Sequence, residues 1–340
     1  MNIATMTNNR NFSFPIQCWL AGDEYEYSDN PKSISATSLI KSTRSIIANK
    51  RYFYPNAFEP ELIDELKKFS NKFIYDLEER IAMRIGTAIH KAIELAVIND
   101  YKNSLRKLNY TEKTIEDFSV NPVSGSETKY TVKTEQRVEK EINGFIISGQ
   151  FDCLINNELH DIKTTSTFSW SNPKIHNKYI TQASIYKWLN PEIITGDSFY
   201  IDFIFTDFNK NIALSKSIEE YPNCKIISKK FPFWSLIETQ MFIENKLREI
   251  EKYWNAPLEE IPCCTDEMLY LTEPVYKYYK SGYKEGKRAT KNFKSFVDAS
   301  LFMSSQGNIG EIIEEKPKAY KCPFCDLTEP EILDLNLEIV

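Results

Sequence analysis

The sequence contains no apolar run long enough to cross a membrane. Its most apolar stretches, around Ile146 and Tyr200, are interrupted by Asp152, Asp202 and Asp207, whereas a transmembrane helix needs roughly 18 or more apolar residues in a row. The first ten residues also lack the apolar centre of a signal peptide. We therefore expect a cytoplasmic protein with no membrane partner.

The sequence also lacks the cysteine framework of a small secreted protein and an overall basic charge. Its seven cysteines are odd in number and irregularly spaced, which favours reduced thiols over a set of disulfides. The formal net charge of -6 excludes a protein coated in positive charge. An enzyme that acts on nucleic acid needs basic residues only along the path of the strand, so charge must be considered locally.

What is present is enough apolar material for a sizeable core. Of the 340 residues, 42% are hydrophobic and 13% are aromatic, as in an ordinary globular protein. The sequence contains no internal repeat and no low-complexity run. We expect a loose N-terminal arm at 1–33, a core with N-terminal helices at 34–255, and a basic C-terminal extension at 256–340.

Hydrophobic periodicity predicts an α/β or α+β core with further structure at both ends. Apolar spacing of three and four residues predicts helices at about 35–49, 81–98, 178–189 and 235–254. Ser35 or Thr37 is the expected N-cap of the first helix. Runs typical of strands occur at about 130–142, 145–155, 159–165 and 199–205. Asn143-Gly144, between the first two of these strands, is a strong signal for a hairpin turn.

Two of the expected strands carry charged residues in a chemically useful pattern. Alternate side chains on a strand share a face, so Asp161 and Lys163 project together, while His160 points to the other side. Asp152 lies on the preceding strand of the same hairpin, which brings its carboxylate towards that of Asp161. Two carboxylates and a lysine are therefore expected to converge on the sheet.

This combination suits the hydrolysis of phosphodiester bonds. Carboxylate and carbonyl oxygens are hard ligands for Mg²⁺, which keeps several waters and also binds substrate phosphates. A bound metal activates water, and a lysine ammonium neutralises charge in the transition state. The alternative is a solvent-facing strand with an ordinary Asp161/Lys163 pair, because Asp-x-Lys by itself is a weak motif.

Four short motifs, taken together, make the pattern more specific. In chain order they are Gly86-Thr-Ala-Ile-His90, Gly149-x-x-Asp152, Asp161-Ile-Lys163 and Gln182-x-x-x-Tyr186. Over residues 81–189 the chain resembles the RecB-like branch of the PD-(D/E)XK nuclease superfamily, to which the lambda-type exonucleases and CRISPR-associated adaptation nucleases are related. The resemblance implies a restriction-endonuclease-like α/β core, in which a central mixed sheet is flanked by helices, with helical additions at both ends.

The resemblance implies a role for each matched residue. Binding of Mg²⁺ or Mn²⁺ is implied for four ligands: His90, Asp152, Asp161 and the carbonyl of Ile162. Catalysis is implied for Asp152, Asp161 and Lys163, and contact with nucleic acid for Gln182 and Tyr186. Two nearby glutamates remain open: Glu94 and Glu135 are either exposed residues or ligands of a second metal or water. A histidine among apolar helix residues, as His90 is, would otherwise belong to the core.

A basic tract at 276–294 supplies positive charge that the whole chain lacks. Seven lysines and arginines against one glutamate give it a local charge of +6, and five aromatic residues are interleaved. Such a surface pairs with phosphates and stacks on bases, although many charge runs are merely solvated. We expect DNA contacts from Lys287, Arg288 and Lys291. The segment 254–325 also resembles the tail of phage-encoded nucleases of this branch.

The cysteines invite comparison with relatives that hold an iron–sulfur cluster. Several members of the branch bind four irons through one cysteine before the nuclease core and three after it. This chain has Cys18 before the core and Cys322 and Cys325 near its end, but no third cysteine follows. Cys263 or Cys264 would have to complete a cluster or a zinc site. We therefore expect no iron–sulfur cluster.

The sequence favours a metal-dependent DNA exonuclease acting in phage recombination, repair or replication, where it would meet other recombination or replication proteins. A structure-specific or restriction-like endonuclease is the alternative within enzymes. A catalytically silent nuclease fold that serves as a DNA-binding module is the alternative from another class. Loss of a catalytic residue would indicate the silent module, and Asp152, Asp161 and Lys163 are all present.

Overall fold

The computed structural model describes residues 5–22, 28–67, 74–262, 274–280, 282 and 286–315. Its α-helices are α1 (Phe14–Ala21), α2 (Ala36–Leu39), α3 (Thr43–Phe53), α4 (Pro60–Lys67), α5 (Ile81–Lys107), α6 (Glu112–Glu116), α7 (Pro173–Leu189), α8 (Lys210–Ala213), α9 (Leu236–Tyr253) and α10 (Phe296–Ser305). Its strands are β1 (Thr5–Thr7), β2 (Ser33–Ser35), β3 (Ile74–Asp76), β4 (Phe118–Val120), β5 (Tyr130–Ile142), β6 (Phe145–Ile155), β7 (Glu158–Thr165), β8 (Ser198–Phe205), β9 (Ile226–Pro232), β10 (Val275–Tyr279), β11 (Lys291–Phe293) and β12 (Glu311–Glu315).

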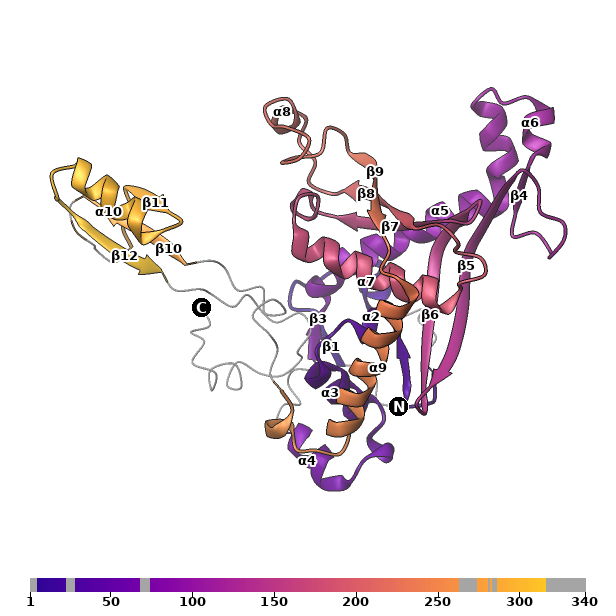
Figure 1. The fold of residues 1–340 in the computed structure, drawn as a ribbon, viewed down its shortest axis with the longest axis horizontal. Coiled ribbons are helices and arrows are strands. Elements are labelled where there is room, and N and C mark those ends of the chain that lie inside the picture. Colours follow the sequence, from indigo (N-terminus) through magenta and orange to yellow (C-terminus); the bar gives the residue numbers. More distant parts are fainter. Residues whose placement is uncertain are drawn as a thin grey trace.

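A curled mixed sheet of seven strands forms the centre of the fold (Figure 1). Its order is β4-β5-β6-β7-β8-β9, with β2 paired to β6. The β5–β6, β6–β7 and β8–β9 pairs are antiparallel, whereas β4–β5, β2–β6 and β7–β8 are parallel. The predicted α/β class with a mixed sheet flanked by helices is therefore confirmed, as are the four predicted strands and the helices at 178–189 and 235–254.

Two tight turns set the register of the central meander. Asn143 and Gly144 have φ of 50° and 75°, and Asn156 and Asn157 have φ of 47° and 70°. Asparagine and glycine tolerate this left-handed backbone, which two-residue hairpin turns need in order to match the twist of the strands. The first turn places Ile142 opposite Phe145, and pairing then continues along β5 and β6.

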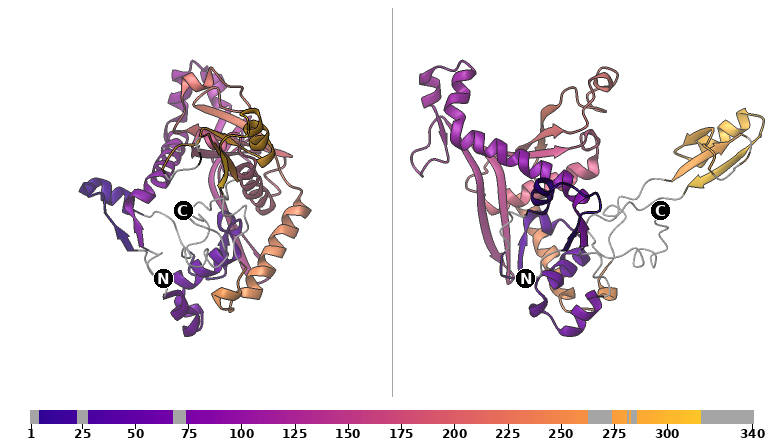
Figure 2. Two further views of the ribbon diagram at one scale, coloured as in Figure 1. Left: turned by 90° about the vertical axis from the view of Figure 1, so that its left-hand side faces the viewer. Right: turned by 180° about the vertical axis from the view of Figure 1, so that it is seen from behind.

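The sheet is covered on its two faces by different helices. Figures 1 and 2 show α5 and α7 on opposite faces of the sheet. On β8, Phe199, Ile201, Phe203 and Phe205 alternate into the core and are fully buried, and α7 contributes much of the apolar cover on that side. Helix α5 lies against β7. The layers therefore enclose the middle of β6 and β7 from both sides.

The outer side of α5 is open to solvent. Met83, Ile85, Leu95 and Ile98 are exposed large apolar residues on this helix, whereas Arg84 is buried. The apolar periodicity that predicts the helix is real, since α5 spans Ile81–Lys107. Much of that apolar face is not covered by the described part of the chain.

The N-terminal region differs from the predicted arm and single helix. Within 1–33, β1 pairs in parallel with β3, and α1 packs near α5, so the described part of this segment has regular structure. The helix expected at 35–49 is two helices, α2 and α3. Ser35 caps α2 as predicted, but Ser42 accepts a hydrogen bond from the backbone N–H of Ser45 and starts a new helix.

The C-terminal unit is built on a small sheet, whereas a helical addition was expected. Strands β11, β10 and β12 form an antiparallel sheet with α10 packed against it. The Val-Tyr-Lys-Tyr-Tyr run of β10 combines aromatic and β-branched residues that favour strands, and Tyr278 is fully buried there with its hydroxyl donating to the Ile309 carbonyl. No helix in the part of the chain that the structure describes is long and apolar enough to span a membrane.

Candidate active site

The candidate site lies where β6 and β7 separate. Their pairing covers Cys153–Ile155 and Glu158–His160, so Asp152 and Asp161 are the first residues beyond the paired part. The Asp152 Oδ2 atom accepts a 2.7 Å hydrogen bond from the Ile162 backbone N–H. This bond ties the carboxylate to the neighbouring strand while leaving the gap between the strands open to groups from both faces of the sheet.

A buried Asp161 and a partly exposed Lys163 form an ion pair in this gap. The Lys163 Nζ lies 2.6 Å from the Asp161 Oδ2, and Asp161 is 4% exposed. No hydrogen bond of acceptable geometry reaches this oxygen from the described residues. Burial of a carboxylate with so few partners costs free energy, unless a further cation or hydrogen-bond donor also binds it.

His90 reaches the same group from α5. Its Nδ1 is 3.6 Å from the Asp152 Oδ1, on the opposite side of the sheet from α7. From the α7 side, the Lys163 ammonium lies 5.8 Å from the centre of the Tyr179 ring. The structure therefore brings together His90, Asp152, Asp161 and Lys163, which the sequence motifs place on one helix and two strands.

The charges of these groups are strongly coupled. Burial raises the pKa of Asp161 to about 6, although the Lys163 ammonium opposes this shift. Burial would also raise the pKa of Asp152, but His90 and Lys163 hold it below its ordinary value. Burial disfavours the charged form of Lys163, yet the two carboxylates outweigh it and raise its pKa. The neighbouring Asp152 raises the pKa of His90.

Gln182 and Tyr186 lie beside the ion pair but are not exposed. The Gln182 Nε2 donates a 2.6 Å hydrogen bond to the Tyr186 hydroxyl, and both side chains are buried. Burial raises the pKa of that hydroxyl, and Asp161 raises it further. Neither residue offers an exposed group to a strand in this structure, so their contact with nucleic acid stays a prediction. Their observed role is to close the α7 side of the site.

Gly149 explains why α7 can approach so closely. A Cβ atom at this position would lie 2.6 Å from the Leu189 Cδ1 and 2.9 Å from the Tyr186 Cδ1. Glycine is therefore required by the packing of α7 against β6 rather than by an unusual turn. The glycine of the Gly149-x-x-Asp152 motif therefore lets α7 lie close to β6, and this close approach places Tyr186 next to the site.

Of the two glutamates that the sequence left open, Glu135 lies near Asp152, and Glu94 lies near Glu135. Burial raises the pKa of Glu135, and the negative charges of Asp152 and Glu94 raise it further. The Glu94 carboxylate itself is 2.7 Å from the Lys91 Nζ. The sequence pattern of β5 did not single out Glu135, because the strand contains several other charged residues. The unusual backbone conformation of Glu135 is seen only in the structure.

The donor types fit a divalent cation, but the side chains do not yet surround one. The carboxylates of Asp152 and Asp161 and the imidazole of His90 are appropriate ligands for Mg²⁺ or Mn²⁺. No three His, Cys, Asp or Glu side chains among the residues described are close enough to hold a metal as they stand. Cation binding would need small side-chain movements that draw Asp152 and Asp161 together.

The basic tract has a different surface from the one predicted. Tyr278 and Tyr279 are buried, so they form the centre of the small C-terminal sheet and are not available for stacking on bases. Tyr276 lies beside Phe296. The predicted platform of interleaved aromatics is therefore wrong for the two buried tyrosines, because the strand uses them as its core.

Acidic residues also lie across the same sheet. Strand β12 pairs Glu314 with Tyr276 and Glu311 with Tyr279, and Lys277 forms an ion pair with Glu315. These glutamates offset part of the local +6 charge. The three predicted DNA contacts are all exposed: Lys287, Arg288 and Lys291. The Lys291 ammonium lies 4.5 Å from the centre of the Phe302 ring, and DNA contact by this group stays a prediction.

Two other predictions concern residues away from the site. His160 points to the opposite side of β7, as expected, and its Nδ1 is 2.9 Å from the Asp202 Oδ2. Cys18 is a free, exposed thiol. The remaining candidate cluster ligands, Cys263, Cys264, Cys322 and Cys325, lie outside the described residues.

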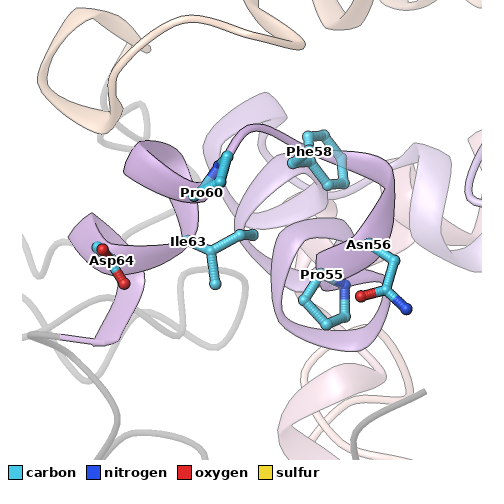
Figure 3. Close-up of a pocket in the computed structure, with 6 residues that line it drawn as sticks. All are labelled: Pro55, Asn56, Phe58, Pro60, Ile63 and Asp64. Atoms are coloured by element: carbon cyan, nitrogen blue, oxygen red, sulfur yellow. The ribbon is translucent and has the colours of Figure 1, made fainter.

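A pocket elsewhere in the fold is unrelated to this chemistry. It has a volume of about 390 Å³ and is lined by residues of the 55–64 segment, with Phe58, Pro60 and Ile63 around it (Figure 3). Asp64 is the sole ionisable residue in its lining. The pocket offers no group of converging polar side chains, so the charged site at the strand separation is the stronger candidate for function.

Comparisons with known proteins give distant structural likenesses. No family model matches the chain, and no curated protein matches it. The crystal structure of SSO0001 aligns over 72% of this chain and 87% of its own, with 16% identity and a TM-score of 0.38. A phage-related exonuclease from Haemophilus somnus 129PT aligns over 65% and 93%, with 15% identity and a TM-score of 0.27. TM-scores this low carry no argument, so functional inference depends on the site itself.

Proposed function

We propose that this protein is a metal-dependent nuclease of the PD-(D/E)XK superfamily that hydrolyses DNA, and that it acts as an exonuclease of the RecB-like branch. The observation that carries the proposal is the meeting of Asp152, Asp161, Lys163 and His90 where β6 and β7 separate. Paired carboxylates beside a lysine suit a reaction in which a phosphate must be bound, polarised and attacked by water.

His90, Asp152 and Asp161 would hold the cation, with the Ile162 carbonyl as a fourth ligand. When bound, Mg²⁺ or Mn²⁺ would supply an activated water and neutralise charge on the phosphate. The Ile162 N–H keeps the Asp152 carboxylate oriented. Imidazole is a better ligand for Mn²⁺ than for Mg²⁺, so we expect activity with Mn²⁺ to equal or exceed that with Mg²⁺.

Lys163 would place its ammonium beside the reacting phosphate. Its raised pKa keeps the ammonium protonated at neutral pH, which suits stabilisation of negative charge more than proton abstraction. Tyr186 and Gln182 exclude water on the α7 side, because both are buried and the Gln182 amide donates a hydrogen bond to the Tyr186 hydroxyl. A low local dielectric strengthens the interaction between the ammonium and an anionic substrate.

The test is cleavage of end-labelled linear, single-stranded and closed circular DNA in Mg²⁺, Mn²⁺ or EDTA. Asp161→Asn is the informative variant, because asparagine keeps the shape of the side chain and an oxygen that can accept from the Lys163 ammonium, whereas alanine removes both. We expect this variant to lose at least about 100-fold in rate, as for removal of a group that stabilises the transition state. Asp202→Asn is the matched control, since Asp202 lies on the adjacent strand and pairs with His160 on the other face.

Four results would contradict the proposal or refine it. Cleavage that persists in EDTA, or an Asp161→Asn variant as fast as the wild type, would overturn it. Cutting of closed circles would replace the exonuclease by an endonuclease. Binding of DNA without any cleavage would indicate a silent nuclease fold. Degradation of linear DNA alone, with loss in Asp161→Asn and retention in Asp202→Asn, is the expected outcome.

A further inference from the structure

Glu135 has a backbone conformation that its residue type disfavours. Within the described ranges, eight non-glycine residues have a positive φ, and seven of them are asparagines. The eighth is Glu135, with φ of 50°. Asparagine enters this left-handed region more readily than other residues with a side chain, whereas glutamate has no such local compensation. The chain therefore places a glutamate where it otherwise uses asparagine.

The distortion lies inside a strand and directly opposite Asp152. Strand β5 pairs Thr134 with Cys153 and Gln136 with Phe151. The register is the same on both sides, and Glu135 and Asp152 face each other between these pairs without being paired themselves. The alternation of buried residues along β6 also shifts by one residue here: Phe151 is buried before Asp152, and the next buried residue is Leu154. The irregular backbone is thus confined to the point at which β6 presents its carboxylate.

The Glu135 side chain belongs to the same electrostatic group as the candidate site. Gln150 donates a hydrogen bond from its Nε2 to the Glu135 Oε2. Glu135 and Asp152 occupy facing positions of the β5–β6 ladder, between the Thr134–Cys153 and Gln136–Phe151 pairs. Carboxylates that face each other repel, which disfavours the protein without a cation and favours binding of one between them.

We propose that Glu135 contributes a carboxylate to the divalent-cation site, facing Asp152 across β5 and β6. The inference rests on the proposed metal-dependent function and deepens it. Asp161 belongs to the same site: the Lys163 ammonium lies 2.6 Å from its buried Oδ2, and no hydrogen bond of acceptable geometry reaches that oxygen from the described residues. The left-handed backbone turns the glutamate towards this group at the expense of local stability.

Cation binding and stability together test this role without an activity assay. Mn²⁺ is titrated by isothermal calorimetry into wild type, Glu135→Asn and Glu135→Gln, and thermal unfolding is followed without metal. Asparagine removes the carboxylate and suits the left-handed backbone, whereas glutamine removes only the charge. Glu141→Gln, an exposed change on the same strand, is the control.

We expect the Mn²⁺ Kd to rise about 10- to 100-fold in both Glu135 variants, as for residues that support a metal site, and to stay unchanged in Glu141→Gln. Without metal, Glu135→Asn should unfold at a higher temperature than the wild type. A wild-type Mn²⁺ affinity in both Glu135 variants would overturn this inference and leave the proposed nuclease intact. A wild-type protein that binds no Mn²⁺ would overturn both.

Discussion

Replacement of Gly149 by alanine is a direct test of how the site is built. The added Cβ would lie 2.6 Å from the Leu189 Cδ1 and within 3.2 Å of two Tyr186 ring atoms. Leu189 can rotate to some extent, but the Tyr186 ring is buried and its hydroxyl is bonded to Gln182. The new methyl group must therefore push α7 away from β6.

The expected cost follows from two opposing effects. Overpacking of a well-filled core costs about 1–3 kcal/mol, whereas exchange of glycine for alanine gains about 0.4–1 kcal/mol through the unfolded chain. For Gly149→Ala the net loss should be about 1–2 kcal/mol, because the neighbouring atoms include a ring that cannot yield easily. In a folded unit of this size that corresponds to a fall in Tm of about 2–8 °C.

Thermal and urea unfolding, followed by circular dichroism, measure this change. Gly86→Ala is the matched control, because a Cβ at Gly86 in α5 meets nothing within 4 Å. It should stabilise the protein by about 0.5–1 kcal/mol. The double variant Gly149→Ala/Leu189→Ala provides space for the methyl group and should show a favourable coupling of at least about 0.5 kcal/mol.

The reasoning is refuted if Gly149→Ala behaves like Gly86→Ala, with equal or higher stability than the wild type. That result would mean that α7 does not approach β6 as closely as described. An additive double variant would likewise remove Leu189 from the explanation. A loss of stability with favourable coupling would support the role of Gly149 in placing Tyr186 beside Lys163.

Three further predictions concern other parts of the chain. His160 and Ser228 hold the pKa of Asp202 below its unfolded value, so the stability advantage of wild type over Asp202→Asn should be full above about pH 4 and should shrink as pH falls further; a pH-independent difference in urea midpoints would refute this. Replacement of the exposed Lys287, Arg288 and Lys291 by alanine should reduce the slope of log affinity for DNA against log salt by roughly one for each phosphate that the protein no longer binds. An unchanged slope would mean that these residues are solvated surface. Anaerobically purified protein should be colourless and free of stoichiometric iron, and a brown preparation would restore the four-cysteine cluster.

Local sequence patterns determined the central elements of the fold. Alternating strand residues and the Asn143-Gly144 turn predicted the β5–β6–β7 meander to within a residue. The same alternation placed Asp161 and Lys163 on one face and His160 on the other. These predictions succeeded because strand periodicity and turn conformation depend on residues close together in the chain.

Local patterns predicted the structure less well where a capping residue divided a helix or where strand pairing buried side chains. Ser42 divided the expected first helix, because its side chain caps α3. The tyrosines of β10 were expected on a surface, but pairing with β11 and β12 buried Tyr278 and Tyr279 and brought glutamates alongside. Composition gives the charge of a segment but not the charge of the strand that lies next to it.

The motifs in the sequence by themselves identified the candidate site residues: His90, Asp152, Asp161 and Lys163. Only the tertiary structure decided how they are supported. It buried Gln182 and Tyr186 on the side of α7 that faces the sheet, and it placed the left-handed Glu135 opposite Asp152. The physical reason is that burial and opposition across strands arise from contacts between distant segments, while a motif records only residue type and spacing.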